Sequence, residues 1–558
     1  MSPAACPSWP RHQFSAAVPY VLALIGVGLP AVAALALHAY GIPRNDDWAY
    51  RWALSRFVSS GHLVGSRWGS MTLVGQILWT APWVEILGGG AWVPDLAVGV
   101  LAMAGLLAAY TLARGFLGPW RATAATATLI IAPGFALSTS SFMTDVPALA
   151  ASLLSVAAGA RSFTALSPRR SAAWLAASCL LGLWAFCIRE FSVCAPMAVL
   201  LAHALRPGGR RRALLVTAGF GAACVLAYVA ISQLPGDRAT TFAGPSLAAL
   251  RTLVAAFITF SFMMAPVIPS LASQLVRSRS GRRCLATAGL CALVCAAWAW
   301  GRPGGLYVGN YLWGQGVGGE ALLGGGRAPL WSPAAWAVLQ ALGVVCASVV
   351  GASVLRAARR GTGLRAAAYN APSLSTRYVL VAFSVLYSLM LGAFTLATGQ
   401  SLWDRYLWPL VFAGAALALG ARGYERHRWL WPATAAAGAL VLVISSVLTL
   451  NSDSFDGARW QAAQAEVARG YPADRVDAGL EWVGSHAPGP LLVHRVLAAA
   501  PAYFTWYDEM FPAFRPCALV RASPLSAVGV QLVATRSYQQ IAFAVPEKLF
   551  VYRVGLHC

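Results

Sequence analysis

Apolar runs of about 20 residues recur along the first 450 positions of the chain, separated by short polar segments. A helix of this length crosses the hydrocarbon core of a bilayer, and backbone groups in lipid must be hydrogen-bonded within their own segment. Each run therefore predicts a transmembrane helix, and the chain is expected to be a polytopic α-helical membrane protein. Thirteen helices are predicted, at about 17–39, 92–113, 122–137, 146–160, 172–188, 192–205, 213–231, 251–270, 285–300, 333–355, 378–397, 405–421 and 429–449.

The composition agrees, with 58 % hydrophobic residues, 11 % charged residues and a mean hydropathy of +0.63. The formal net charge of +22 does not indicate nucleic-acid binding, because arginines gather in short loops that would share one side of the membrane. By the positive-inside rule this side is cytoplasmic, next to anionic membrane lipids. We therefore expect a multi-pass protein of the cytoplasmic (inner) membrane, with a cytoplasmic N-terminus and an extracytoplasmic C-terminus. The arginine-rich loops are 161–170, 206–212, 277–283, 356–365 and 422–428.

Acidic residues test this topology, because they were not used to build it. The chain has only 19 Asp and Glu, and nearly all of those before position 451 fall on the outer side or its membrane edge. The exception is Glu425. The outer face is thus expected to carry the polar chemistry. The outer residues are Asp46, Asp47, Glu85, Asp95, Asp145, Glu190, Asp237, Glu320 and Asp404.

Two outer regions are long enough to have structure of their own. In the first outer loop, about 40–91, residues 48–58 and 71–87 predict helices that lie in the membrane interface. After Asn451 the composition becomes more polar, so 1–450 is expected to form the transmembrane module and 451–558 a small α+β domain outside the membrane. Helices are predicted at 458–468 and 474–486, strands at 491–496, 517–521, 530–535 and 548–554, and a disulfide between Cys517 and Cys558 is an open alternative.

Asp46 and Asp47 follow the first predicted span directly. One interpretation is structural: Asn45 caps a helix, and carboxylates in its first turn complement the helix dipole. The other is chemical: one carboxylate removes a proton from an attacking hydroxyl at the membrane surface. A tight cap would lower the pKa of the carboxylate and weaken it as a base. The sequence does not say which Asp would react.

Further candidates lie on the same predicted side, and each also has a structural interpretation. Thr144, Asp145 and Pro147 form a helix-start signal that still leaves a carboxylate facing outward. Arg405, followed by Tyr406, either extends its charge toward the membrane surface or offers its planar fork to a phosphate. The remaining candidates for substrate or phosphate binding are Arg189 and Glu190, which also suit a local ion pair, and Arg67, His62 and Gln76 in the first outer loop.

The order of these features resembles the C-type glycosyltransferases. An acidic pair follows the first span, Thr-Asp-x-Pro the third, Arg-Tyr-Leu-x-Pro lies near the twelfth, and an outer domain follows. The nearest groups are the protein O-mannosyltransferases, the lipid A aminoarabinose transferases and the rhizobial galacturonosyltransferase-like proteins. The stretch 474–482 also looks like the outer domain of some bacterial members. Two departures are Asp-Asp where Asp-Glu is common, and the absence of Lys-Pro-Pro from the first outer loop.

This resemblance implies transfer of a sugar from a polyprenyl-phosphate carrier, with inversion, to a lipid, polysaccharide or protein acceptor at the outer face. It matches Asp46 or Asp47 to the catalytic acid of the first loop, Asp145 to the second outer acid, and Arg405 and Tyr406 to the late Arg-Tyr pair. No cofactor is certain, and members differ in their use of a divalent metal. The alternatives are a transporter or flippase of a lipid-linked or envelope precursor, an O-antigen ligase or polymerase, and an assembly protein whose outer domain binds a partner.

Overall fold

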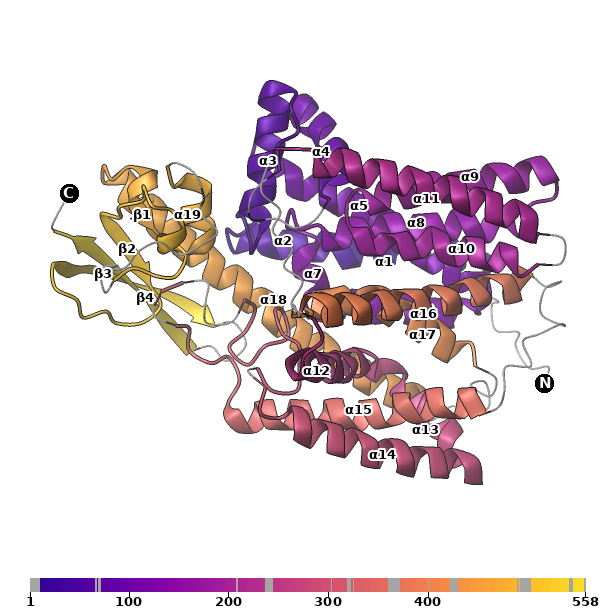
Figure 1. Cartoon of the computed structure of the whole chain (residues 1–558). Coiled ribbons are helices and arrows are strands. Elements are labelled where there is room, and N and C mark those ends of the chain that lie inside the picture. The colour runs from indigo at the N-terminus through magenta and orange to yellow at the C-terminus, as the bar shows by residue number, and fades with distance from the viewer. Residues whose placement is uncertain are drawn as a thin grey trace, which may run out of the picture.

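The structure is a computed structural model of the chain. It describes residues 11–65, 68, 72–206, 209–235, 244–302, 304–318, 323–324, 326–359, 372–399, 401–421, 430–488, 491, 503–540 and 545–555. Helices arranged side by side form an elongated bundle, and a small sheet lies beyond one end of it (Figure 1). The predicted fold class, a polytopic helical membrane protein with a small α+β domain, is confirmed.

Each of the thirteen predicted spans coincides with helical structure. The first is continuous through a π-helical segment, the third consists of two short helices, and the eighth is bent. In chain order the helices are α1 (Arg11–Ala23), η1 (Leu24–Gly28) and α2 (Leu29–Ala36); α5 (Val93–Arg114); α6 (Pro119–Ile130) and α7 (Phe135–Ser138); α8 (Asp145–Ser162); α9 (Pro168–Phe186); α10 (Cys194–Ala204); α11 (Arg210–Ser232); α12 (Leu247–Met263), η3 (Ala265–Val267) and α13 (Ile268–Val276); α14 (Arg279–Ala299); α15 (Pro333–Arg359); α16 (Pro372–Thr398); α17 (Trp408–Leu419); and α18 (Leu430–Ala468).

Not all of these helices are long enough to cross a membrane alone. Among the described residues, seven helices are both long and apolar enough, or eight if the pair bent by 58° at Met264 forms one span. The shorter helices include α10, with 11 residues, and α17, with 12. Both follow a 3-10 turn, η2 (Glu190–Val193) and η4 (Asp404–Leu407), at the end of the bundle nearest the sheet. These turns shorten the helices where candidate residues lie.

The long helices differ in how much of their surface the protein covers. In α5, 67 % of the most apolar stretch of the helix is buried inside the protein, whereas in α11 and α14 only 17 % and 22 % of that stretch is buried. Leu214, Leu226 and Leu290 are largely exposed there. A helix that exposes leucines along its length suits contact with lipid tails, so α11 and α14 are peripheral and α5 is central.

The first outer loop forms the two expected helices, α3 (Asp47–Ser60) and α4 (Val74–Leu87). They lie at the sheet end of the bundle, where α3 crosses the direction of the bundle helices (Figure 1). Trp79 of α4 donates a hydrogen bond to the carbonyl of Ala97 in α5, at 2.9 Å. The loop is therefore packed against the bundle as an ordered layer.

Helix α18 joins the bundle without a break to the C-terminal domain, which is called the outer domain below after its predicted location. It has 39 residues and continues through the predicted boundary near residue 450, so 458–468 is the end of this helix and not a separate one. The domain adds η6 (Ala473–Arg475), α19 (Leu480–His486), η7 (Asp508–Met510) and a sheet of order β1-β2-β4-β3. The strands are β1 (Val476–Asp477), β2 (Ala518–Arg521), β3 (Val530–Gln540) and β4 (Val545–Val554); β1 is parallel to β2, and the other pairs are antiparallel.

Three of the predicted strands, 517–521, 530–535 and 548–554, are confirmed as β2, β3 and β4. The predicted helix 474–486 is wrong over its first half, because Val476 and Asp477 pair with Ala518 and Leu519. The predicted strand 491–496 lies outside the described residues except for Leu491. Cys517 is disulfide-bonded, and Cys558 lies outside the described residues.

Candidate active site

Asp46 stands at the start of α3, but its side chain makes no capping hydrogen bond. Its Oδ1 accepts a hydrogen bond from Nε1 of Trp68 at 2.7 Å, and its Oδ2 lies 3.6 Å from Nη2 of Arg405. The side chain is 19 % exposed. Asp46 is therefore a partly accessible carboxylate that faces the late arginine, and not a helix cap.

Asp47, its neighbour, has a different environment. Its side chain is fully buried and forms an ion pair with Arg51, which also pairs with Asp95 of α5. Its Oδ2 accepts further hydrogen bonds from the backbone N–H of Phe142 at 2.9 Å and from Nη2 of Arg51 at 3.2 Å. Asp47 thus fastens α3 to the bundle, and both of its oxygens are occupied.

Asp145 begins α8, as the Thr-Asp-x-Pro signal predicts, and the side chain of Thr144 does not cap the helix. Instead, Asp145 lies between two arginines. It forms an ion pair with Arg189, and its Oδ2 lies 3.3 Å from Nε of Arg405. Asp46, Arg405, Asp145 and Arg189 therefore form one row of alternating charge, built from four segments that are far apart in the sequence.

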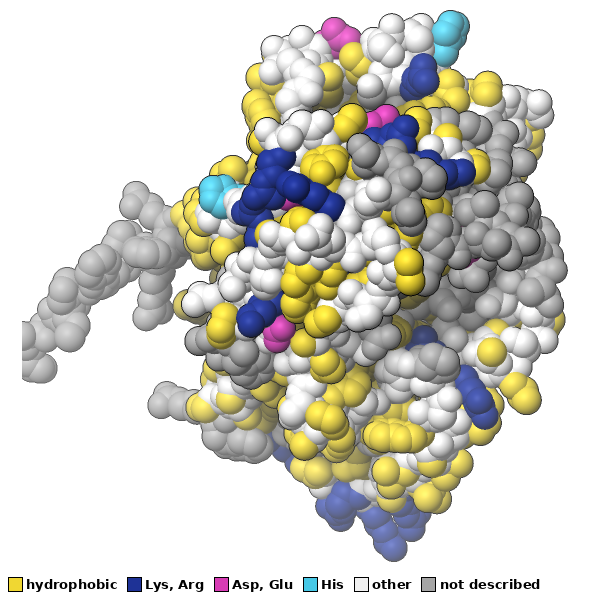
Figure 2. Space-filling model, turned by 90° about the vertical axis from the view of Figure 1, so that its left-hand side faces the viewer, with side chains coloured by type: hydrophobic (Ala, Val, Ile, Leu, Met, Phe, Trp, Pro, Cys, Tyr) yellow, Lys and Arg dark blue, Asp and Glu magenta, His cyan; other side chains and the backbone are white. Residues whose placement is uncertain are grey.

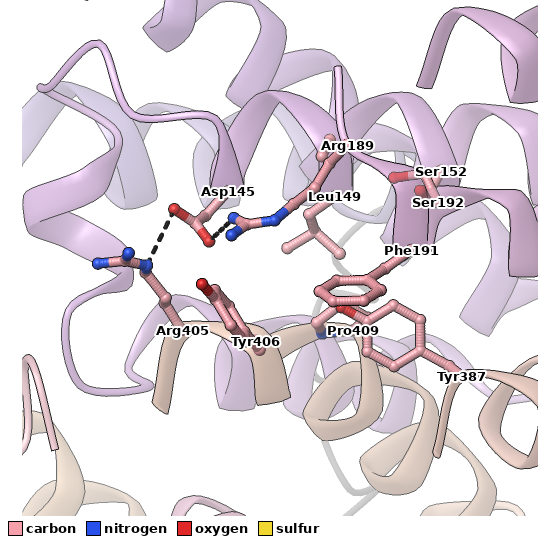
Figure 3. Close-up of a pocket in the computed structure, with 11 residues that line it drawn as sticks. Asp145, Leu149, Ser152, Arg189, Phe191, Ser192, Tyr387, Arg405, Tyr406 and Pro409 are labelled. Carbon is pink, nitrogen blue, oxygen red and sulfur yellow. Dashed lines mark hydrogen bonds and ion pairs between the residues drawn. The ribbon is translucent and has the colours of Figure 1, made fainter. Parts of the chain in front are cut away.

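Arg189 and Arg405 line a small cavity of about 20 Å³ together with Asp145 and Tyr406 (Figure 3). The guanidinium carbon of Arg189 lies 4.3 Å from the centre of the Tyr406 ring, within the range of a cation–π contact. Nη1 of Arg405 and Nε of Arg189 are buried and have no hydrogen-bond partner in the described part of the chain. The cavity is about large enough for one water and is lined by two guanidinium groups.

Backbone hydrogen bonds to Asp404 hold the turn that carries Arg405. The buried carboxylate of Asp404 accepts from the N–H groups of Tyr311, Leu312 and Arg405, at 2.8, 2.6 and 2.8 Å. Tyr311 in turn contacts Ser138 through its hydroxyl, at 2.8 Å. The segment between α14 and α15 thus fixes η4 and, through it, the position of Arg405.

The other predicted site residues lie farther from this cavity. Gln76 is buried, and its Nε2 donates to the carbonyl of Phe142 at 3.0 Å, so it supports the same backbone as Asp47. His62 is exposed beyond the end of α3. Glu190 is the first residue of η2, directly after Arg189, and does not line the cavity. Arg67 lies outside the described residues.

Three residues of this site were not among the predicted site residues. Trp68 donates to Asp46, Asp404 holds the Arg405 turn, and Tyr50 of α3 interacts electrostatically with Asp46, Arg189 and Arg405. Burial, reinforced by the charge of Asp46, raises the pKa of Tyr50 well above its usual value, so its hydroxyl stays protonated. The position of Asp404 beside Arg405 was the only sequence signal for any of them.

The surface at this end of the molecule differs from the interior in charge. Seen from the outer domain, it shows more dark-blue Lys and Arg than magenta Asp and Glu (Figure 2). Several acids at the sheet end of the bundle, such as Asp47, Asp95 and Asp404, are fully buried. Asp47 and Asp95 are partners of Arg51, whereas Asp404 accepts from backbone N–H groups.

Comparison with known proteins found no matching family model and no matching curated protein. Among solved structures, the chain is similar to ArnT from Cupriavidus metallidurans bound to undecaprenyl phosphate, at 13 % identity and a TM-score of 0.42 over 98 % of both chains. It is also similar to the archaeal oligosaccharyltransferase AglB from Archaeoglobus fulgidus, at 13 % identity and a TM-score of 0.44 over 91 % of this chain and 65 % of that one.

Proposed function

We propose that the chain is a membrane glycosyltransferase that moves a sugar from a polyprenyl-phosphate-linked donor to an acceptor at the outer face of the cytoplasmic membrane. One observation carries this proposal: Asp46 and Asp145 meet on Arg405 at one end of the bundle, beside a cavity that Arg189 also lines. Transfer from a sugar phosphate needs a base for the acceptor hydroxyl and positive charge beside the leaving phosphate. The carboxylate of Asp46 can be the base, and the guanidinium groups of Arg405 and Arg189 can supply the charge.

In this reaction Asp46 acts as the base. It takes the proton of an acceptor hydroxyl, the hydroxyl oxygen forms a bond to C1 of the sugar, and the bond from C1 to the phosphate oxygen breaks on the opposite face. The configuration at C1 is therefore inverted. The lipid phosphate leaves with the bonding electron pair, and the proton remains on Asp46 until water removes it. General-base catalysis of this kind typically contributes about 10²–10⁴-fold.

Arg405 and Arg189 stabilise the negative charge that develops on the leaving phosphate. Planar guanidinium groups match phosphate oxygens in pairs, and donors fixed before the reaction need no reorganisation as charge develops. Asp145 contacts both arginines and so sets their separation. We assign Asp145 a positioning role.

Asp46 is preferred over Asp47 as the base because of the surroundings of the two side chains. Both oxygens of Asp47 are taken up by Arg51 and the backbone of Phe142, and the side chain is fully buried. Asp46 is partly exposed, and its Oδ1 accepts the N–H of Trp68 in a hydrogen bond of ordinary length. The same N–H keeps one oxygen oriented while the other can accept a proton.

A divalent metal would need a set of oxygen or nitrogen ligands close to the phosphate. Within the described part of the chain, no three His, Cys, Asp or Glu side chains gather as such a set. These residues do not fit a metal site, and the positive charge in the proposed mechanism comes from Arg189 and Arg405. The acceptor is a hydroxyl of a lipid, a polysaccharide or a protein.

The outer location of the site is part of the proposal and has its own test. His62 is exposed just after α3, and Leu166 is 93 % exposed in the arginine-rich loop between α8 and α9. In a background that lacks the free cysteines and keeps disulfide-bonded Cys517, a membrane-impermeant maleimide added to intact cells should label His62→Cys and leave Leu166→Cys unlabelled. Labelling of Leu166→Cys alone would place Asp46 in the cytosol and contradict the proposal.

The function itself is tested by Asp46→Asn in a strain that lacks the gene. Envelope glycans should change in the deletion strain, and Asp46→Asn should fail to restore them although it accumulates normally in the membrane. The expected loss of transfer is about 100-fold or more. Asp474→Asn is the matched control, because Asp474 is a half-buried outer-domain residue away from the site.

Two results would contradict the proposal. If the glycans were unchanged in both the deletion strain and the Asp46→Asn strain, the protein would not be the proposed transferase. A transporter would instead lose flux of its substrate across the membrane while transfer by a separate enzyme continued.

A further inference from the structure

The outer domain reaches the residue that precedes Asp46. Asn45 has a left-handed backbone conformation, with φ of 55°, at the bend that leads into α3. Its backbone N–H donates a 3.0 Å hydrogen bond to Oε1 of Glu481 in α19. Asn tolerates this conformation better than most residues, but a backbone held there needs support from its surroundings.

Glu481 is itself held firmly. Its Oε2 lies 2.8 Å from Nη1 of Arg459 in α18, and Arg459 also contacts Asp456 at 3.0 Å. Glu481 is 1 % exposed and Arg459 is fully buried. Burial raises the pKa of Glu481, and Arg459 opposes this effect. The carboxylate therefore has one oxygen for α18 and one for the bend at Asn45.

Arg44 forms a second link on the other side of the bend. Its Nη2 lies 2.5 Å from Oδ1 of Asp453, and its Nε lies 3.5 Å from Oδ2 of Asp456. Both acids belong to the part of α18 that continues into the outer domain. The two residues before Asp46 are thus bound to this domain, one through its side chain and one through its backbone.

Close packing leaves little room for this interface to shift. A methyl group added at Gly484 of α19 would lie 2.3 Å from the Trp48 ring, and one added at Gly457 of α18 would lie 2.1 Å from the carbonyl oxygen of Leu37. Real contacts are not this short, so the helices of the outer domain lie directly on the segments before and after Asp46.

We propose that Glu481 is a positioning residue for Asp46, so that the docked outer domain is needed for the transfer step. This inference rests on the proposed function of Asp46. Glu481 fixes the bend at Asn45, and that bend directs Asp46 toward Trp68 and Arg405. Misplacing a reacting group by about 1 Å can lower a rate by about 100-fold, so a change at Glu481 should act on transfer without removing the phosphate site.

Two substitutions test this proposal. Glu481→Gln keeps the shape of the side chain but replaces one acceptor oxygen by a donor, which must face either the N–H of Asn45 or the guanidinium of Arg459. Glu481→Asp keeps the buried charge opposite Arg459 but is one methylene too short to serve both partners. Because the second variant keeps the ion pair, it remains informative if the first does not accumulate.

The matched control is Glu466→Gln. Glu466 is a fully buried acid of α18 that is also paired with an arginine, Arg469, but it does not contact residues 44–46. For each variant we would measure the amount in the membrane, the Kd for undecaprenyl phosphate in lipid nanodiscs, and the rate at which envelope glycans form in the complemented deletion strain.

For both Glu481 variants we expect glycan formation to fall about 10–100-fold, with the Kd for undecaprenyl phosphate within twofold of wild type. Glu466→Gln should leave all three measurements unchanged. Glycan formation within twofold of wild type, or a parallel loss of lipid-phosphate binding, would overturn the positioning role. If Asp46→Asn is inactive while both Glu481 variants are active, only this inference fails; if Asp46→Asn is active, the proposed function fails.

Discussion

The candidate site and the interface with the outer domain are both built from arginines and carboxylates, yet they differ in access. At the interface, Asp453 and Glu481 are 1 % exposed and Arg459 is fully buried. At the site, the side chain of Asp46 is 19 % exposed, and Arg189 and Arg405 line a cavity. Unpaired guanidinium nitrogens occur in both places, on Arg44 and on Arg405. A buried arginine without a full set of partners is therefore not enough to mark a binding site; a space beside it is also needed.

The balance of charge differs as well. At the interface, Asp453, Asp456 and Glu481 form ion pairs with Arg44 and Arg459, so among these ion-paired groups the acids outnumber the arginines. At the site two arginines face two acids, and Asp145 is shared between both arginines. A phosphate that widened the one-water cavity between them would find cationic groups that are only partly neutralised.

Arg405→Lys gives the sharpest test of this difference. Lysine keeps the positive charge but is a single point donor, so it cannot contact Asp46, Asp145 and a phosphate together as the guanidinium fork does. Transfer should fall by about 100-fold or more, as with the loss of other charge-stabilising donors, and binding of undecaprenyl phosphate should weaken. Both would be measured in the complemented deletion strain and in nanodiscs.

The control for this substitution is Arg515→Lys. Arg515 is exposed on the outer domain and donates to the backbone carbonyls of Pro512 and Phe514. Wild-type transfer is expected for this variant. If Arg405→Lys were equally active, the fork geometry of Arg405 would have no part in the reaction.

The helices were predictable because their signal is local. A run of apolar residues long enough to cross a bilayer predicts a helix whatever the rest of the chain does, and all thirteen predicted ranges coincide with helical structure. The boundary near Asn451 depended on composition alone. A polar sequence can continue a helix, and α18 does so until Ala468. Val476 and Asp477 were predicted as helix because their strand partner, residues 518–519, lies far along the chain.

The candidate site was predictable only in part. The sequence selected Asp46, Asp145, Arg189 and Arg405, and the fold brings their side chains together. It could not separate Asp46 from Asp47, because the distinction arises from Arg51, Asp95 and the backbone of Phe142. Trp68 was missed for the same reason: nothing near it in the sequence shows that its N–H meets Asp46. The roles assigned to Asp46, Asp145, Arg189 and Arg405 remain predictions.

The packing at the interface yields a smaller and separate prediction. In Gly484→Ala the new methyl group would lie 2.3 Å from the Trp48 ring, so the backbone of α19 must move away from α3. Overpacking of this kind typically costs about 1–3 kcal/mol. The thermal unfolding midpoint in detergent, followed by tryptophan fluorescence, should fall, and transfer should fall with it because α19 carries Glu481.

Gly219→Ala is the control: Gly219 lies within α11 with no atom within 4 Å of the added methyl, and alanine favours a helix by up to about 1 kcal/mol relative to glycine. A Gly484→Ala protein with the midpoint and the transfer rate of wild type would mean that α19 can leave Trp48 without moving Asp46. The buried charges of the interface would then stabilise the outer domain alone. The arginines of the interface would serve stability and those of the candidate site would serve the reaction, with no connection between the two clusters.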